Sequence, residues 1–186
     1  MSDKRFIENG VITGKPNLIT EKVGVDNMNL KDLKNRRIKY EWKTIFVGVQ
    51  ENYFSKDVIS NYAVELMEIG DESWFVSELA WGVSSEELDK VMLEIKTNYF
   101  PQLDEESTIL VEENRKLRFV CLSEIKERCK EDNELLNKIA EFYGNHHYPE
   151  DMVSFVNYMP QEVQTTKEDM INRFDKFLKL ESVRFS

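Results

Sequence analysis

Four carboxylates with helical spacing are the residues of this chain that come closest to a metal-dependent active site. Glu65 and Glu68 stand three positions apart, and Glu86 and Asp89 repeat that spacing further along the chain. Residues three apart lie on one face of a helix. Two such helices running antiparallel can bring four carboxylates together around Mg²⁺, which would also bind the phosphate oxygens of a nucleotide.

This spacing resembles the metal motif of the all-α nucleotide triphosphate pyrophosphatases, and the resemblance implies a Mg²⁺-dependent pyrophosphohydrolase. It spans only residues 65–89, inside a segment so rich in acids that the spacing can arise from composition alone. No cluster of Lys or Arg beside it is available to hold phosphates, and the chain has no glycine-rich phosphate loop, nucleophile elbow or Cys/His pairing. We therefore expect no catalysis and no cofactor, with Mg²⁺ only under this alternative.

The two histidines of the chain, His146 and His147, are the second place to look for chemistry, because Glu150 and Asp151 follow them. Neighbouring side chains in a turn seldom converge on one metal, and the chain has no HExxH motif. Pro149 suits the first position of a helix, and the two acids suit its first turn, where they complement the helix dipole. The segment predicts a turn followed by a helix rather than a metal site.

The elements that would position such residues are predicted to be helices. Low counts of Gly (7) and Pro (4) disfavour a loop-rich β-sandwich. From residue 41 onward, apolar residues recur at helical intervals and predict a compact all-α domain of about seven helices. Capping boxes are expected at Ser84–Glu87 and Thr165–Glu168. We expect an irregular N-terminal arm, or a short β-hairpin, at 1–40 and a single helical domain at 41–186.

The cysteines and the hydropathy pattern indicate a cytoplasmic protein. Cys121 and Cys129 are eight apart in one predicted helix, about 12 Å along its axis, which is too far for a disulfide. Reduced thiols are typical of the cytosol. The N-terminus lacks the apolar run of a signal peptide, and no stretch of eighteen apolar residues could span a membrane.

The net charge of −10 is concentrated in one part of the chain. Residues 45–114 contain sixteen Asp/Glu and three Lys/Arg, whereas residues 1–44 contain six Asp/Glu and ten Lys/Arg. Such an acidic segment repels nucleic acid and anionic lipid and attracts basic proteins or cations. We expect neither nucleic-acid nor membrane binding. Solubility alone also favours acidic helical surfaces, so the charge does not by itself identify a partner.

The tryptophans have two interpretations that the sequence leaves open. Trp42, Trp74 and Trp81 fall at helix-packing positions and are expected in the core, as is Met67. The alternative is an exposed anchor, because Trp and Tyr are concentrated in the energetic centres of protein interfaces.

Two longer stretches carry a family resemblance: "WKTIFVGVQENYFSKDVISNYAVELMEIGDESWFVSELAWG" at 42–82 and "YGNHHYPEDMVSFVNYMP" at 143–160. They resemble a helical bacterial family catalogued as a domain of unknown function, over roughly residues 41–182. Members of that family are similar, in size and gene setting, to the immunity proteins of polymorphic toxin systems. The resemblance implies no active-site residues.

The resemblance implies an antitoxin-like protein that binds and neutralises a basic toxin, such as a nuclease domain. An acidic helical face would steer that association. A regulatory or scaffold protein with another partner remains the alternative. The candidate partner-binding residues are the carboxylates and tryptophans of the acidic segment: Glu65, Glu68, Asp71, Glu72, Trp74, Trp81, Glu86 and Glu87.

Overall fold

A computed structural model of the chain describes residues 28–102 and 107–185. The β-hairpin considered for the N-terminal arm, and the arm up to residue 27, lie outside the described residues.

The prediction of an all-α fold is confirmed. Within the described ranges no strand forms, and the one β-bridge is isolated, between Met28 and Phe54. None of the helices found there is both long enough and apolar enough to cross a membrane. In chain order the elements are α1 (Leu30–Asn35), α2 (Trp42–Gln50), α3 (Asp57–Glu68), α4 (Trp74–Ala80), α5 (Leu88–Tyr99), α6 (Thr108–Arg128), α7 (Asp132–Asn145), the 3₁₀-helix η1 (Glu150–Phe155) and α8 (Lys167–Phe185).

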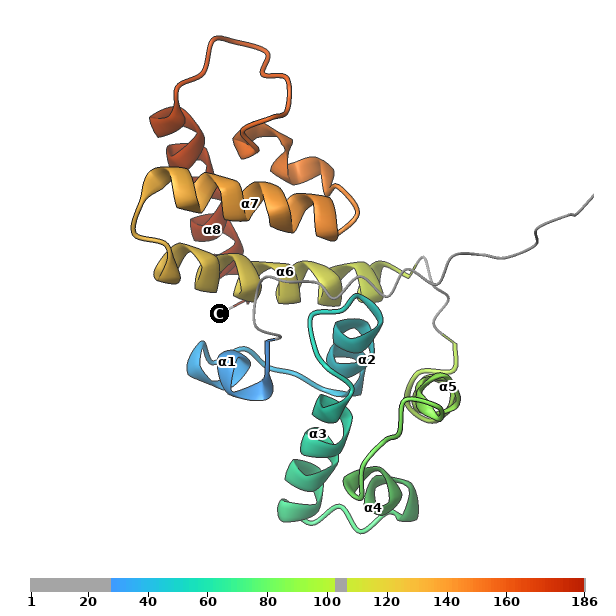
Figure 1. Cartoon of the computed structure of the whole chain (residues 1–186). Helices are drawn as coiled ribbons and strands as arrows, with labels where there is room; N and C mark the ends of the chain where they lie inside the picture. The colour runs from blue at the N-terminus through green and yellow to red at the C-terminus, as the bar shows by residue number, and fades with distance from the viewer. Residues whose placement is uncertain (1–27, 103–106, 186) are drawn as a thin grey trace, which may run out of the picture.

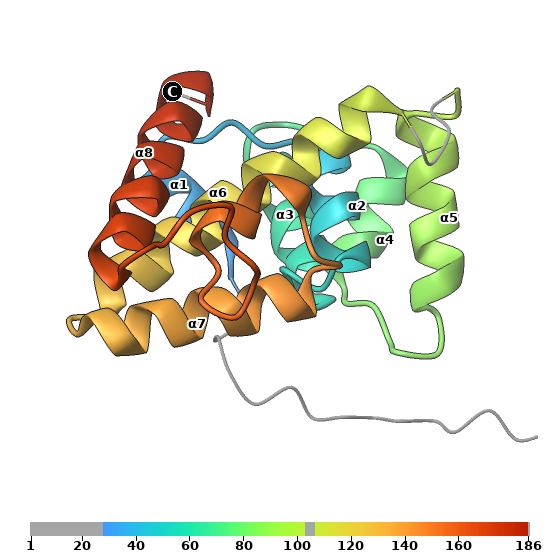
Figure 2. The same cartoon turned by 90° about the horizontal axis from the view of Figure 1, so that it is seen from above.

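The long helix α6 runs through the middle of the molecule (Figures 1 and 2). Helices α7 and α8 with η1 pack on one side of it, and α2 packs on the other. Residues 119–123 of α6 are buried without interruption. A helix with neighbours on opposite sides buries side chains on more than one face, which is why α6 lacks a single apolar stripe.

The helical domain begins earlier than the predicted boundary at residue 40. Asn29 caps α1, because its Oδ1 accepts from Lys31 N at 2.9 Å while Asp32 Oδ2 accepts from Asn29 N at 2.8 Å. Leu30 and Leu33 of this short helix are buried in the core. Residues 30–35 therefore form a helix that packs into the core, where an irregular arm was expected.

The two predicted capping boxes have different outcomes. At Ser84 and Glu87, Glu87 N donates to Ser84 Oγ at 3.3 Å, as expected, and the Ser84 hydroxyl donates to Glu87 Oε2 at 2.6 Å, just before α5. The box at Thr165 is wrong by one residue. Thr166 and Asp169 form it instead, with Thr166 N donating to Asp169 Oδ2 at 2.9 Å and Asp169 N donating to Thr166 Oγ1 at 3.1 Å.

The two thiols are free, as expected. Cys121 is buried within α6, and burial raises the pKa of its thiol to about 12. A thiol that stays protonated at neutral pH is a poor nucleophile, so Cys121 serves packing.

A buried carboxylate joins α2 to α6. Glu113 is 7% exposed, and its Oε2 accepts from Thr44 Oγ1 at 2.7 Å. The Lys116 ammonium donates to both carboxylate oxygens of Glu113, at 2.8 and 2.7 Å. The charge of Glu113 is thereby compensated inside the protein, as a buried carboxylate requires.

Gly48 is fixed by the chain that returns over α2. Its carbonyl accepts from Tyr53 N at 2.8 Å and Phe54 N at 2.9 Å, so the ring of Phe54 lies directly on the glycine. A Cβ at this position would overlap the Cδ2 and Cε2 atoms of that buried ring.

We expect Gly48→Ala to lower the free energy of unfolding by about 1–3 kcal/mol, the usual cost of overpacking a core. Helix propensity alone predicts the opposite sign, a gain of about 1 kcal/mol. Urea unfolding measures the difference. A stabilised Gly48→Ala variant would contradict the packing of Phe54 on α2.

Candidate binding surface

The four carboxylates of the metal hypothesis do not come together. In the part of the chain that the structure describes, no group of three or more His, Cys, Asp or Glu side chains is placed to hold a metal ion. Glu65 instead accepts from Lys34 Nζ at 2.7 Å and from Tyr40 Oη at 2.5 Å. Helix α4 packs against α3 where the hypothesis requires α5, so Glu86 and Asp89 are carried away from Glu65.

The histidines lie at a turn, as predicted. His146 ends α7, and its ring stacks on Tyr53 and Phe142 with centroid distances of 4.5 and 4.1 Å. The exposed His147 has φ 61° and places its Nε2 3.7 Å from a carboxylate oxygen of Glu51.

The helix after this turn differs in detail from the prediction. It is a 3₁₀-helix, and Pro149 is its N-cap residue rather than its first helical residue. Asp151 accepts from Arg118 at 2.5 Å and so ties η1 to α6. The acids at 150–151 thus have a structural role in addition to their place in the first turn.

A groove with apolar walls lies between α3 and α4. It has a volume of about 430 Å³ and is lined by Val64, Met67, Glu68, Ser77, Ala80 and Trp81. The α3–α4 pair forms the end of the molecule away from α7 and α8 (Figure 1). No described helix packs over this groove, which leaves its apolar walls in contact with solvent.

Two of the three tryptophans are exposed, and one of them, Trp81, lines this groove. Trp74 is 73% and Trp81 92% exposed, whereas Trp42 is 5% exposed. Trp74 is the first residue of α4 and Trp81 is its C-cap, seven residues and about two turns further on, so the two project from the same side of the helix. The expectation of a core position is confirmed for Trp42 and wrong for Trp74 and Trp81. It is also wrong for Met67, which is 44% exposed on the groove wall.

Carboxylates surround the tryptophans without any nearby cation in the sequence. Residues 57–89 contain nine Asp/Glu and no Lys or Arg. Glu87 is engaged by Ser84, and Asp71 accepts from Ser73 N at 2.9 Å, a bond that lowers the pKa of Asp71. Four further carboxylates of this segment form no ion pair among the described residues. Three of them are predicted contacts and the fourth, on α4, is not: Glu68, Glu72 and Glu86, and Glu78.

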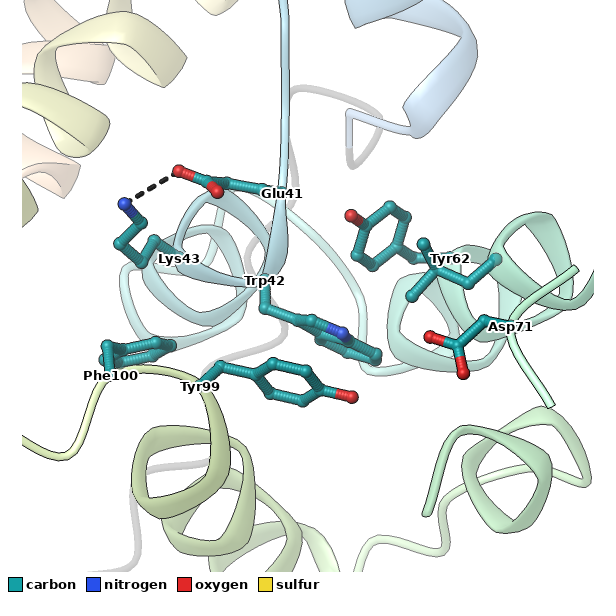
Figure 3. Close-up of a pocket in the computed structure, with 8 residues that line it drawn as sticks. Glu41, Trp42, Lys43, Tyr62, Asp71, Tyr99 and Phe100 are labelled. Atoms are coloured by element: carbon teal, nitrogen blue, oxygen red, sulfur yellow. Dashed lines mark ion pairs between the residues drawn. The ribbon is translucent and has the colours of Figure 1, made fainter. Parts of the chain in front are cut away.

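An aromatic pocket opens where α2 begins and α5 ends (Figure 3). It has a volume of about 260 Å³. Trp42 stacks on Tyr99 with ring centroids 5.1 Å apart and meets Tyr62 edge-on at 4.8 Å. Asp71 faces the pocket from the loop after α3, and the ion pair of Lys43 with Glu41, at 2.7 Å, borders it.

Three residues at these two sites, Val64, Glu78 and Tyr99, are not among the contacts predicted from the sequence. Glu78 lies between the tryptophans on the exposed part of α4, and Val64 and Tyr99 line the groove and the pocket. One signal for the exposed face was present: the spacing of seven between Trp74 and Trp81 with Glu78 between them. No comparable signal marks the pocket, because its walls come from three helices and a loop.

Together the fold and these sites define an all-α domain that presents an acidic, tryptophan-bearing helix pair. The chain belongs to a family of uncharacterised proteins conserved in bacteria (DUF2247), which matches residues 30–182. The match begins at the first residue of α1, in agreement with the packing of that helix into the core. Neither the curated proteins nor the solved structures gave a match to the chain.

Proposed function

We propose that this protein is a non-catalytic binding domain whose α3–α4 surface binds a basic protein. One observation carries the proposal: Trp74 at the start of α4 and Trp81 at its C-cap are both exposed to solvent, and Trp81 lines an open apolar groove. Because these indoles are exposed in the free protein, a partner that covers them buries their apolar area. Trp is also enriched among the residues that dominate the binding energy of protein interfaces.

The charge around the groove indicates the chemistry of the partner. Glu68 lies in the groove wall, and Glu78 lies between the tryptophans, each without an ion pair among the described residues. A surface with unpaired carboxylates around an apolar centre complements Lys and Arg around an apolar patch. Anionic partners, including nucleic acid, would be repelled by the same surface.

The specific form of this proposal is an immunity protein that neutralises a basic toxin, such as a nuclease domain. Support comes from the resemblance of its family to immunity proteins and from the acidic surface, which would both accelerate association and compete with a phosphate-bearing substrate. The cytoplasm, where such a toxin would act, is the compartment we propose. The four carboxylates that a Mg²⁺-dependent hydrolase would use lie apart, and no feature of the described residues favours that alternative.

The test is a binding experiment with the full chain and the basic products of genes that neighbour its own. We expect a stoichiometric complex whose association rate falls at least about tenfold between low salt and about 0.5 M salt. Glu68→Lys with Glu78→Lys should slow association to a similar extent. Glu131→Lys with Glu162→Lys is the matched control, because it changes the net charge equally at exposed sites outside α3 and α4.

Two results would contradict the proposal. Equal effects of the two double variants would mean that only net charge matters and that α3–α4 is not the contact surface. An association rate that does not change with salt would exclude a basic partner steered by this surface.

A further inference from the structure

The aromatic pocket contains a hydrogen-bond donor that the fold leaves unused. Trp42 is 95% buried, yet its Nε1 has no hydrogen-bond partner in the described part of the chain. Figure 3 shows this nitrogen on the pocket side of the indole, with the Tyr99 hydroxyl and the Asp71 carboxylate facing the same space. A buried N–H without an acceptor is destabilising by about 1–3 kcal/mol. A ligand that enters the pocket can supply the missing acceptor.

The potential in the pocket is negative. Burial raises the pKa of Tyr62 to about 12, and the charges of Glu41, Glu65 and Asp71 contribute to the rise. Burial and then the Asp71 charge raise the pKa of Tyr99, while the Trp42 indole, close by but outside hydrogen-bond geometry, offsets part of that rise. Among the described residues that line the pocket, Lys43 is the one cation, and it is paired with Glu41. These charges favour a cationic ligand and disfavour a phosphate.

The walls select among cations. The ring of Tyr99 is 40% exposed and borders the pocket, so it can stack on a flat cation. A guanidinium is planar, stacks on aromatic rings and forms paired hydrogen bonds with a carboxylate, whereas an ammonium is a compact, strongly hydrated point charge. The cavity of about 260 Å³ accommodates the head of one such side chain.

Resting on the proposed function, we propose that this pocket binds an arginine side chain of the basic partner. The guanidinium pairs with Asp71 and stacks on Tyr99, and the indole N–H of Trp42 donates to a main-chain carbonyl of the segment that presents the arginine. The pocket and the α3–α4 groove have no lining residue in common, but α3 contributes to both: Tyr62 and Leu66 line the pocket, and Val64, Met67 and Glu68 line the groove.

The test needs no partner protein. The full chain, labelled with ¹⁵N, is titrated with N-acetyl-arginine N-methylamide up to about 100 mM, enough to detect one weak contact. The indole signals of Trp74 and Trp81 are identified by Trp74→Phe and Trp81→Phe, which alter exposed side chains only. We expect a saturable shift of the Trp42 indole signal and little change in the other two. The citrulline analogue, equal in shape but uncharged, should produce no saturable shift.

Asp71→Asn should weaken the arginine contact at least about fivefold, because it removes the paired charge. Asparagine keeps the turn, since its side-chain oxygen can also accept from Ser73 N. Glu72→Gln, one residue along and exposed, removes a charge outside the pocket lining and should change the affinity less than twofold, about 0.4 kcal/mol. An unmoved Trp42 signal, or equal shifts with arginine and citrulline, would overturn the inference. The charge reversals on α3 and α4 test the proposed function separately, so the two can fail independently.

Discussion

Lys116→Met is expected to lower the free energy of unfolding by about 3–5 kcal/mol, a large share of the stability of a domain of this size. The substitution keeps the volume of the lysine stem but leaves Glu113 charged and buried with only Thr44 as a partner. The side chains of Lys116 and Glu113 are 14% and 10% exposed, so solvent cannot replace the lost ammonium. Chemical denaturation of the free protein measures the loss.

Two further variants distinguish the effect of leaving a buried carboxylate without its partner from the effect of removing a lysine anywhere in the chain. Glu113→Gln combined with Lys116→Met should recover part of the loss, because the buried carboxylate is removed together with its partner. Lys126→Met removes an ammonium that pairs with Asp175 on the surface, where both side chains are more than a third exposed, and should cost less than about 1 kcal/mol. Equal losses for Lys116→Met and Lys126→Met would contradict a buried, compensated Glu113.

Most of the fold could be predicted from local patterns in the sequence. Val58, Ile59 and Tyr62 recur at helical intervals in the sequence, and all three side chains are buried in α3. Gly70 and Gly82 follow α3 and α4, and there the chain adopts φ of 98° and 113°, which glycine tolerates without strain. Periodicity of this kind is strong where a helix buries one face against the core.

Helix α1 was missed because its signal is short. Six residues provide only two buried side chains, Leu30 and Leu33, too few to define a helical period. The cap at Asn29 and Asp32 was readable in the sequence but stood among basic residues that indicated an exposed arm. Contact with α3, including the bond from Lys34 to Glu65, holds this helix in place.

The binding surface was only half predictable, for a physical reason. An apolar residue at a packing position of a helix predicts that this face of the helix will be covered. It does not show whether the covering surface belongs to the same chain or to a partner. Trp74 and Trp81 followed the core pattern, yet α4 lies at the end of the molecule with α3 on one side and solvent on the other. The acidic residues were easier to place, because carboxylates without partners must reach solvent.

Trp81→Ala is expected to weaken the complex with the basic partner about 30-fold or more, which corresponds to about 2 kcal/mol, without destabilising the free protein. Trp81 is 92% exposed, so its removal should change the free energy of unfolding by less than about 0.5 kcal/mol. In the complex, the Trp81→Ala variant would lack the indole's contact with the partner and the apolar surface that the indole adds to the groove beside Val64 and Met67. Titration calorimetry and thermal unfolding measure the two quantities separately.

Tyr158→Ala is the matched control, because Tyr158 is an aromatic residue 56% exposed on the segment between η1 and α8, away from the groove. Its removal should change the affinity by less than about 0.5 kcal/mol.

Trp42→Ala should behave in the opposite way to Trp81→Ala in the free protein. It should lower the free energy of unfolding by about 3–5 kcal/mol, because the Trp42 indole is buried among Tyr62 and Tyr99. If Trp81→Ala and Tyr158→Ala weaken binding equally, the groove is not the contact surface. A loss of stability in Trp81→Ala would instead mean that its indole serves the packing of α3 on α4.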